Sequence, residues 1–413
     1  MTLTRTSFLA IPLAFLVTLA ALTLFRGASL PSRAPGGSLA APLRPDADTD
    51  AQIARLQSAV RAGNLGQVGA LAAAYLQKVR ETGDAGFYSR AEGVLKRARP
   101  NDAYAVVQAA TLAAARHDFA RALSLAERAR ALAPESLAAF PVQVDALVEL
   151  GRYDEAERVL QDFIDRKPNL AAYARVSYLR ELHGDLDGAV EAMRAAIAAG
   201  GPVPENIAYV QTLLGGLELS RGRRAEARRA YAAALRAVPN YVPALAGRAR
   251  LEGSIPLWRR VVERLPQPEY AIGLGEAELA AGRTEEGRRD LALVGAEEKL
   301  LAGAGVNTDV ELAIYEADHG SKARGLELAR RAWAQAPSVR SADALGWALT
   351  RAGKPRAGLR WAHRALKLGS LDPVFRYHAA VAARAVGRRD EAARDMRLAR
   401  AHGLAGHPWL VSR

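Results

Sequence analysis

Apolar and polar positions divide the chain into three stretches with different patterns. An uncharged run covers residues 8–25 and reads FLAIPLAFLVTLAALTLF, and Arg26 closes it. Residues 27–50 show no apolar periodicity and are rich in Pro, Gly, Ala and Ser. From residue 51 onward, apolar residues recur with the spacing of amphipathic helices, and Gly and Pro interrupt them at intervals. The pattern therefore predicts an apolar segment, a linker and a long helical region.

The apolar run at 8–25 has the properties of a membrane-directed segment. It is longer than the usual signal-peptide core of about 7–15 residues and close to the lower limit for a spanning helix. Gly27-Ala28-Ser29 offers a cleavage site, but Pro31 follows closely. We expect residues 1–26 to be an uncleaved membrane anchor, with a cleaved signal peptide as the alternative. Basic residues on both flanks leave the orientation open, while the short amino-terminal region favours export of the remaining chain to the cell envelope, or its secretion if the segment is cleaved.

Residues 27–50 have the composition of a disordered tether that its prolines keep extended. Asp48, Thr49 and Asp50 precede an amphipathic stretch and predict the start of the first helix. Residues 51–102 are helical in pattern but fit the later repeat poorly, so we interpret them as a helical cap or as degenerate repeats.

The rest of the chain repeats a unit of about 34 residues that reads helix, tight turn, helix and breaker. Four segments align on a turn glycine followed five residues later by alanine: ELGRYDEAERVL (149–160), LHGDLDGAVEAM (182–193), SRGRRAEARRAY (220–231) and AVGRRDEAARDM (385–396). The first helices repeat a Leu–small pair, seen at Leu214-Gly215, Leu274-Gly275, Leu312-Ala313 and Leu345-Gly346. Prolines close several units, at Pro134, Pro168, Pro239, Pro266 and Pro337.

This combination of period, Leu–Gly pair, turn glycine, alanines and closing proline resembles the tetratricopeptide repeat. The resemblance covers residues 103–406, or about nine units, and leaves 407–413 as a C-terminal tail. It implies an all-α fold, a right-handed solenoid of helical hairpins. The pattern departs from the family in three places. The large aromatic of the first helix is mostly absent, and a spacer occupies 301–305. The unit at 242–267 is short, with Gly253-Ser254 replacing the ordinary helix-turn-helix.

Composition excludes several kinds of chemistry. The 413 residues include no cysteine, which removes disulfides, Cys-ligated metal sites and thiol nucleophiles. No phosphate-binding loop, dinucleotide fingerprint or nucleophile elbow is present. Asp318-His319 is the most site-like pair, but a position at an inter-helix turn explains it better than a metal or acid–base role does. We therefore predict a protein that is not an enzyme, with no catalytic residue, cofactor or metal.

In the tetratricopeptide family the first helices line a concave groove, and the resemblance implies that a peptide or protein partner binds there. The residues on this face are Tyr104, Asp145, Glu149, Tyr178, Glu181, Tyr209, Glu276, Asp318, Trp347 and Tyr377. Aromatic residues interleaved with carboxylates suit a ligand with basic and apolar side chains. The alternative is that Tyr178 and Trp347 belong to the core between units. Val107 and Thr111 stand where a carboxylate clamp needs Lys and Asn, so that activity is not implied.

The net charge of +13 permits an anionic partner but does not require one. Most arginines fall on predicted second helices, where a solvated outer face explains them. Nucleic-acid binding is disfavoured, because exposed aromatics do not alternate with these basic residues. The sequence thus predicts a non-catalytic interaction scaffold at the membrane or cell envelope, attached through residues 8–25. The alternatives are an anion-binding protein that uses its arginine-rich outer face, and an adaptor subunit of an enzyme complex.

Overall fold

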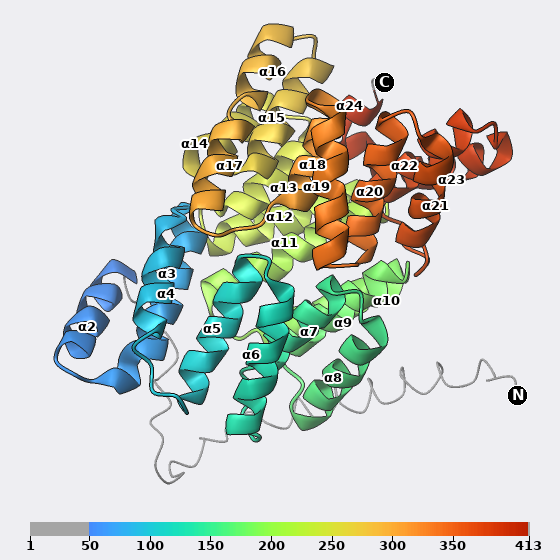
Figure 1. Ribbon diagram of the computed structural model, residues 1–413. Helices are drawn as coiled ribbons and strands as arrows, with labels where there is room; N and C mark the ends of the chain where they lie inside the picture. The colour runs from blue at the N-terminus through green and yellow to red at the C-terminus, as the bar shows by residue number, and fades with distance from the viewer. Residues whose placement is uncertain (1–48, 412–413) are drawn as a thin grey trace, which may run out of the picture. The chain divides into compact units, whose positions relative to one another are not determined.

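The computed structural model describes residues 49–411, and every regular element in this part of the chain is a helix (Figure 1). The all-α prediction is confirmed for these residues. The predicted anchor and almost all of the predicted linker lie outside them. Between residues 49 and 411, no helix is long and apolar enough to cross a membrane.

The first elements precede the repeating region. They are α2 (Thr49–Arg61), the 3₁₀ helix η1 (Leu65–Gln67), α3 (Val68–Thr82) and α4 (Gly86–Leu95). Helix α3 is buried on most of its surface and shares a core with α2, α4 and the first helix of the repeating region. A Cβ atom at Gly69 would lie 2.6 Å from the ring of Tyr104, so the glycine permits this close approach.

Nine antiparallel helix pairs follow within the described residues. They are α5 (Ala103–Ala115) with α6 (Phe119–Leu132), α7 (Phe140–Glu149) with α8 (Tyr153–Arg166), α9 (Leu170–Leu182) with α10 (Leu186–Ala199), α11 (Pro204–Ser220) with α12 (Arg224–Ala237), α13 (Val242–Glu252) with α14 (Ile255–Arg264), α15 (Pro268–Ala280) with α16 (Thr284–Leu291), α18 (Asp309–His319) with α19 (Lys322–Gln335), α20 (Val339–Arg351) with α21 (Pro355–Ala365), and α22 (Pro373–Ala385) with α23 (Arg389–Ala401).

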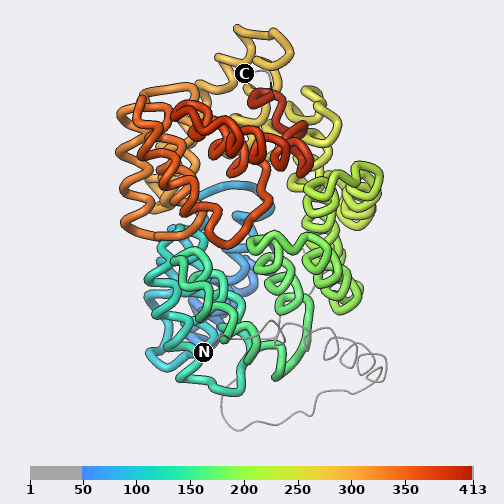
Figure 2. The backbone as a smooth tube through the Cα atoms, turned by 90° about the vertical axis from the view of Figure 1, so that its right-hand side faces the viewer, coloured from blue at the N-terminus to red at the C-terminus, as the bar shows by residue number. Residues whose placement is uncertain are grey.

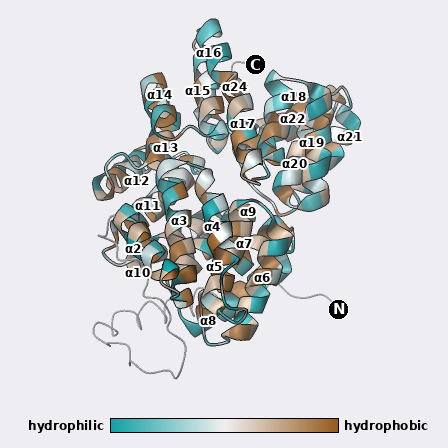
Figure 3. Ribbon diagram, turned by 60° about the vertical axis from the view of Figure 1, so that its left-hand side comes forward, coloured by the Kyte–Doolittle hydropathy of each residue, from teal (hydrophilic) through white to brown (hydrophobic). Residues whose placement is uncertain are grey.

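Small residues let the two helices of each pair pack closely against each other. The repeated alanines Ala122, Ala156, Ala189 and Ala227 are completely buried. Their small side chains let the helix axes approach, and larger apolar residues fill the remaining space. Figure 3 shows the result, with apolar colour concentrated where neighbouring helices face one another and polar colour on the outward sides.

Two predicted irregularities have a different form in the structure. Gly253-Ser254 does not replace the helical hairpin: Gly253 ends α13 with a φ of 65°, and the Ser254 side chain accepts a hydrogen bond from the Leu257 amide to begin α14. The short unit is therefore an ordinary pair with shortened helices. The spacer at 301–305 is also partly helical, because an additional helix, α17 (Val294–Gly303), includes its first residues.

The solenoid curls until later units lie against earlier ones. We call α5–α12 the lower tier and α18–α23 the upper tier; Figure 2 shows the orange and red upper tier above the cyan and green helices. Turns within lower-tier units meet loops of the upper tier in the same order along both. The His117 ring Nδ1 lies 2.6 Å from the Asn307 carbonyl, the Val339 amide donates to the Tyr153 hydroxyl at 2.8 Å, and the His402 Nδ1 lies 2.9 Å from the Ser220 carbonyl.

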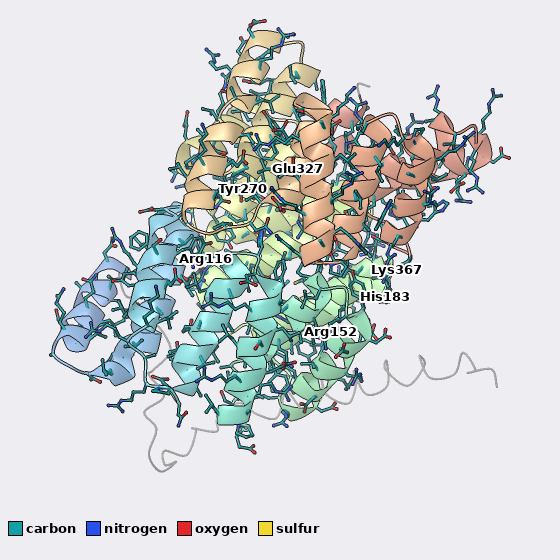
Figure 4. The ribbon with its side chains drawn as sticks, viewed as in Figure 1. Arg116, Arg152, His183, Tyr270, Glu327 and Lys367 are labelled. Carbon is teal, nitrogen blue, oxygen red and sulfur yellow. The ribbon has the colours of Figure 1, made fainter. Side chains whose placement is uncertain are left out.

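Close backbone approach accompanies these bonds. A Cβ atom at Gly151 would lie 2.3 Å from the Pro337 carbonyl oxygen, and one at Gly184 would lie 2.6 Å from the Gly369 oxygen. In Figure 4, His183 and Lys367 are labelled on opposite sides of this boundary. The turn glycines therefore serve the contact between tiers as well as the turns themselves.

The last described residues are not a loose tail. After α23 the chain forms the 3₁₀ helix η2 (Leu404–Gly406) and the short helix α24 (Pro408–Val411), which packs on α15. Leu404 and Leu410 are both buried, and Figure 1 shows α24 beside α15. The prediction of a tail beginning at 407 is corrected for residues 408–411, which are helical and belong to the fold.

Candidate protein-binding groove

First helices of consecutive units line a cavity of about 570 Å³ on the inner side of the solenoid. Most of its wall comes from α7, α9, α11, α13 and the first turn of α15, and the second helices α10 and α12 contribute Met193 and Tyr231. Four of the residues predicted for the groove line it together: Asp145, Tyr178, Glu181 and Tyr209. We call this cavity the inner groove.

Tyrosines form much of the inner groove. Tyr178 is half-buried, and burial raises the pKa of its hydroxyl above the ordinary value. Tyr209 is 44% exposed and is therefore directly available to a ligand. Tyr231 and Tyr270 complete the set, and Figure 4 labels Tyr270 on the inner helix that carries it. Tyrosine rings offer apolar area together with a polar edge, which suits recognition of peptide side chains.

Two carboxylates of the inner groove differ in whether a cationic side chain pairs with them. Asp145 is paired with Arg175 of the next unit. Glu181 makes no hydrogen bond or ion pair through its side chain with any residue in 49–411. Burial, and secondarily the negative charge of Asp372, raise its pKa to about 7. Glu181 is thus a partly buried acid without a cationic partner in the part of the chain that is described.

Glu149 lies beside the inner groove and helps to join the tiers. The Arg340 guanidinium is 3.6 Å from the Glu149 carboxylate of the lower tier and 3.1 Å from Glu311 of the upper tier. Burial raises the pKa of Glu149, and the opposing effect of Arg340 is smaller. The Glu149 carboxylate is therefore engaged in a structural ion-pair network.

Three predicted residues take part in contacts within the upper half of the solenoid. The Trp347 Nε1–H donates to Asp318 at 3.1 Å, and Arg351 lies 3.4 Å from the same carboxylate. His319 lies 3.0 Å from Glu276. Trp347 is only 1% exposed, so its assignment to an accessible groove is corrected in favour of the core alternative. The site-like pair Asp318-His319 is divided between separate partners.

The remaining two predicted residues lie away from the inner groove. Tyr104 is half-buried against α3 at the amino-terminal end of the repeats. Tyr377 is buried and reaches a different cavity near the C-terminus. The structure therefore brings together four of the ten predicted residues in one cavity.

Several lining residues were not predicted: Arg175, Arg250, Glu269 and Tyr270. Arg175 stands three residues before Tyr178, so helical spacing alone places it on the same face. Glu269 and Tyr270 follow Pro268 in the first turn of α15, and only the curvature of the solenoid carries them to this cavity.

Acidic and histidine side chains elsewhere in the described chain are the other candidates for metal ligands or for an acid–base pair. Among the described residues, no group of three or more His, Asp and Glu side chains could hold a metal ion. His378 and Asp343 form a buried pair, with the histidine Nδ1 2.9 Å from the carboxylate, and the His378 ring stacks on Trp347 with 4.1 Å between ring centroids. That pair is enclosed in the core, so it is placed to stabilise the fold.

Comparison with known proteins supports the repeat assignment. Residues 113–177 match the family model of the tetratricopeptide repeat. They run from the end of α5 into α9 and include Asp145 and Glu149. No curated protein shows a significant match to this chain.

A solved structure similar to this chain is the crystal structure of the APC/C hetero-tetramer Cut9–Hcn1. The similarity covers 88% of this chain and 92% of that chain at 13% identity, with a TM-score of 0.31. At that score the superposition is too loose to support a conclusion about fold or function.

Proposed function

We propose that this protein is a non-catalytic interaction scaffold whose inner groove binds a peptide or a segment of a protein partner. The observation that carries the proposal is the cavity of about 570 Å³, lined by tyrosines and by a carboxylate, Glu181, without a partner in the described chain. The match of residues 113–177 to the tetratricopeptide repeat supports it, because such repeats generally present binding surfaces.

The chemistry of the inner groove selects the kind of ligand. A lysine or arginine of the partner would place its charge at Glu181 and its apolar stem along Tyr178. Exposed Tyr209 would cover neighbouring apolar side chains. We therefore propose a segment in which a basic residue is flanked by apolar residues.

The predicted location is part of the same proposal. A tether at residues 8–25 would hold the scaffold at the membrane, with the repeats outside the cytoplasm. Fractionation of cells combined with amino-terminal sequencing of the mature chain tests this separately. A chain that begins at Met1 and is found in the soluble cytosolic fraction contradicts the location and leaves the groove proposal to its own test.

The binding test uses a photo-reactive amino acid at position 209 of the full chain in intact cells, with the same label at exposed Arg228 on α12 as control. The crosslinked segment is identified and synthesised, and its affinity is measured by calorimetry. Glu181→Gln and Tyr209→Ala should each weaken binding by about tenfold, which is the size expected for one central contact.

The matched control is Glu127→Gln, which changes an exposed carboxylate of α6 outside the groove. It should leave the affinity unchanged. Equal crosslinking from positions 209 and 228, or equal affinity of all variants, would contradict binding in the inner groove.

A further inference from the structure

The end of the solenoid formed by α22 and α23 carries a second cavity, of about 970 Å³. Both helices present one face to it. Val381 and Arg384 lie one turn apart on α22, while Arg389, Met396 and Arg400 follow one stripe of α23. Val411 of α24 forms part of the wall and is 59% exposed. We call this cavity the end trough.

The position of the end trough in the fold indicates what shape fits it. In the preceding units, each first helix packs against both helices of the unit before it: α20 contacts α18 and α19, and α22 contacts α20 and α21. The end trough is the corresponding position on α22 and α23. Within residues 49–411, η2 packs there on both helices, and α24, which packs on α15, contributes Leu410 and Val411 to the wall. The surface is therefore built to receive a helix.

The charge around the end trough indicates what chemistry fits it. Arg384, Arg389 and Arg400 are exposed and form no ion pair with any residue of the described chain. Neighbouring arginines are paired, since Arg376 of α22 lies 3.0 Å from Asp395, and Arg388, which precedes α23, lies 3.0 Å from Glu391. The unpaired arginines thus surround an apolar floor with positive charge that the described chain does not neutralise.

We propose that the end trough binds an acidic amphipathic helix of a protein partner, which takes the place of a further first helix. Arg384 and Arg389 stand at the turn between α22 and α23, and Arg400 stands at the other end of α23. Arg400 comes eleven positions after Arg389 in the same helix, a rise of about 16 Å. The partner helix therefore carries carboxylates about three turns apart, on both sides of one apolar stripe.

Two other occupants fit less well. The chain's own apolar segment at 8–25 contains no carboxylate, so it does not supply the complementary charge. An anionic lipid surface supplies charge but no ridge of side chains for the space between two helices. The experiment separates both from the proposed helix.

The test measures fluorescence anisotropy of a labelled synthetic peptide against the full chain in non-ionic detergent. The peptide is an amphipathic helix of about 15 residues with Leu on one face and Glu on both flanks. A second peptide carries Lys in place of Glu, and a third is a scrambled form of the first. The Glu peptide should bind, whereas the Lys and scrambled peptides should bind at least about tenfold more weakly.

Charge reversal gives the decisive comparison. The triple variant Arg384→Glu, Arg389→Glu, Arg400→Glu should bind the Glu peptide at least about tenfold more weakly and should gain affinity for the Lys peptide. The control triple Arg228→Glu, Arg283→Glu, Arg289→Glu makes the same change in net charge on exposed arginines elsewhere and should behave as the unmodified chain. Far-ultraviolet circular dichroism verifies that both variants are folded.

Equal binding of the scrambled peptide, or an equal loss in both triple variants, would overturn the proposal. So would a gain of about tenfold or more in affinity on deletion of residues 8–25, since that segment would then be the occupant. Vesicles containing phosphatidylglycerol form the last arm. If binding of the vesicles depends on the three arginines and binding of the Glu peptide does not, the ligand is a lipid surface. Tyr209→Ala should not change peptide binding, so this result stands apart from that of the inner groove.

Discussion

The ring of Tyr231 lies where two first helices come close to a second helix. A Cβ atom at Gly215 would be 2.5 Å from this ring, and one at Gly247 would be 2.3 Å from it. Gly215, from the Leu–Gly pair of the same unit, and Gly247, from the first helix of the next unit, thus both make room for Tyr231. The same residue lines the inner groove, so packing and the candidate site share one side chain.

Burial of the Glu181 carboxyl group makes the stability of the fold depend on pH. Its pKa is about 7 in the folded protein and about 4.3 in an unfolded chain, because burial disfavours the carboxylate. Between these pH values the folded state therefore binds more protons than the unfolded state. The stabilising contribution of Glu181 is fully present below about pH 4 and is lost as the pH rises through 7. Glu181→Gln should remove this loss.

The measurement is urea unfolding of the full chain at pH 5 and at pH 8. From pH 5 to pH 8, the unmodified chain should lose about 1–3 kcal/mol more of its free energy of unfolding than Glu181→Gln loses. Glu127→Gln, on the exposed face of α6, should lose as much as the unmodified chain. A pH-independent difference for Glu181→Gln would contradict a raised pKa.

Helix α24 shows how a short element depends on tertiary contacts. Its four residues are too few to form a stable helix in isolation. Leu410 is buried in the core with residues of α15 and α18, and Trp409 stacks on His319 with 5.2 Å between ring centroids. The contact of His319 with Glu276 fixes the histidine ring from the other side.

Truncation of Leu410 tests this arrangement. Leu410→Ala should lower the free energy of unfolding by about 2–4 kcal/mol, because it removes buried apolar contacts and leaves a cavity. Val411→Ala, in the same helix but 59% exposed, should change it by less than about 0.5 kcal/mol. Thermal unfolding followed by circular dichroism compares the two, and similar effects would mean that α24 contributes little to the core.

At the scale of the whole molecule, the contact between tiers turns an open repeat array into a closed one. An open solenoid has contacts only between neighbouring repeats, whereas here the Tyr153 hydroxyl accepts a hydrogen bond from Val339, 186 residues later in the chain. The guanidinium of Arg340 lies between carboxylates of both tiers. The curvature that brings these groups together also curls the first helices around the inner groove.

Alanine substitutions at two turn glycines separate the energetic contribution of the contact between tiers from the strain of the turn itself. Gly151 and Gly353 have φ values of 70° and 77°, so alanine should cost each about 1–2 kcal/mol through backbone strain. A Cβ at Gly151 would also meet the Pro337 carbonyl at 2.3 Å, whereas nothing lies within 4 Å of one at Gly353.

Gly151→Ala should therefore lower the free energy of unfolding by about 1–3 kcal/mol more than Gly353→Ala does. Urea titration of the two variants gives this difference directly. Equal losses would indicate that the tiers separate at no cost in solution.

The turn glycines and the repeated alanines could be predicted from the sequence, because they answer local requirements. Gly151 and Gly184 take the left-handed conformation that a tight turn needs, and Ala156 is completely buried where its helix meets the partner helix. The same regularity predicted Tyr178 and Tyr209 on the inner face. It placed Trp347 there as well, and did not show that Asp318 and the ring of His378 enclose it.

The sequence by itself thus determined the helical hairpins, their turns and the side of each helix that faces its neighbour, since these depend on contacts between residues three or four apart and between adjacent units. Only the tertiary structure decided that the tiers meet, that α24 joins the core, and that Glu269 and Tyr270 line the same cavity as Tyr178 and Tyr209. These features depend on small rotations from unit to unit that add up along the solenoid, and no local pattern records their sum.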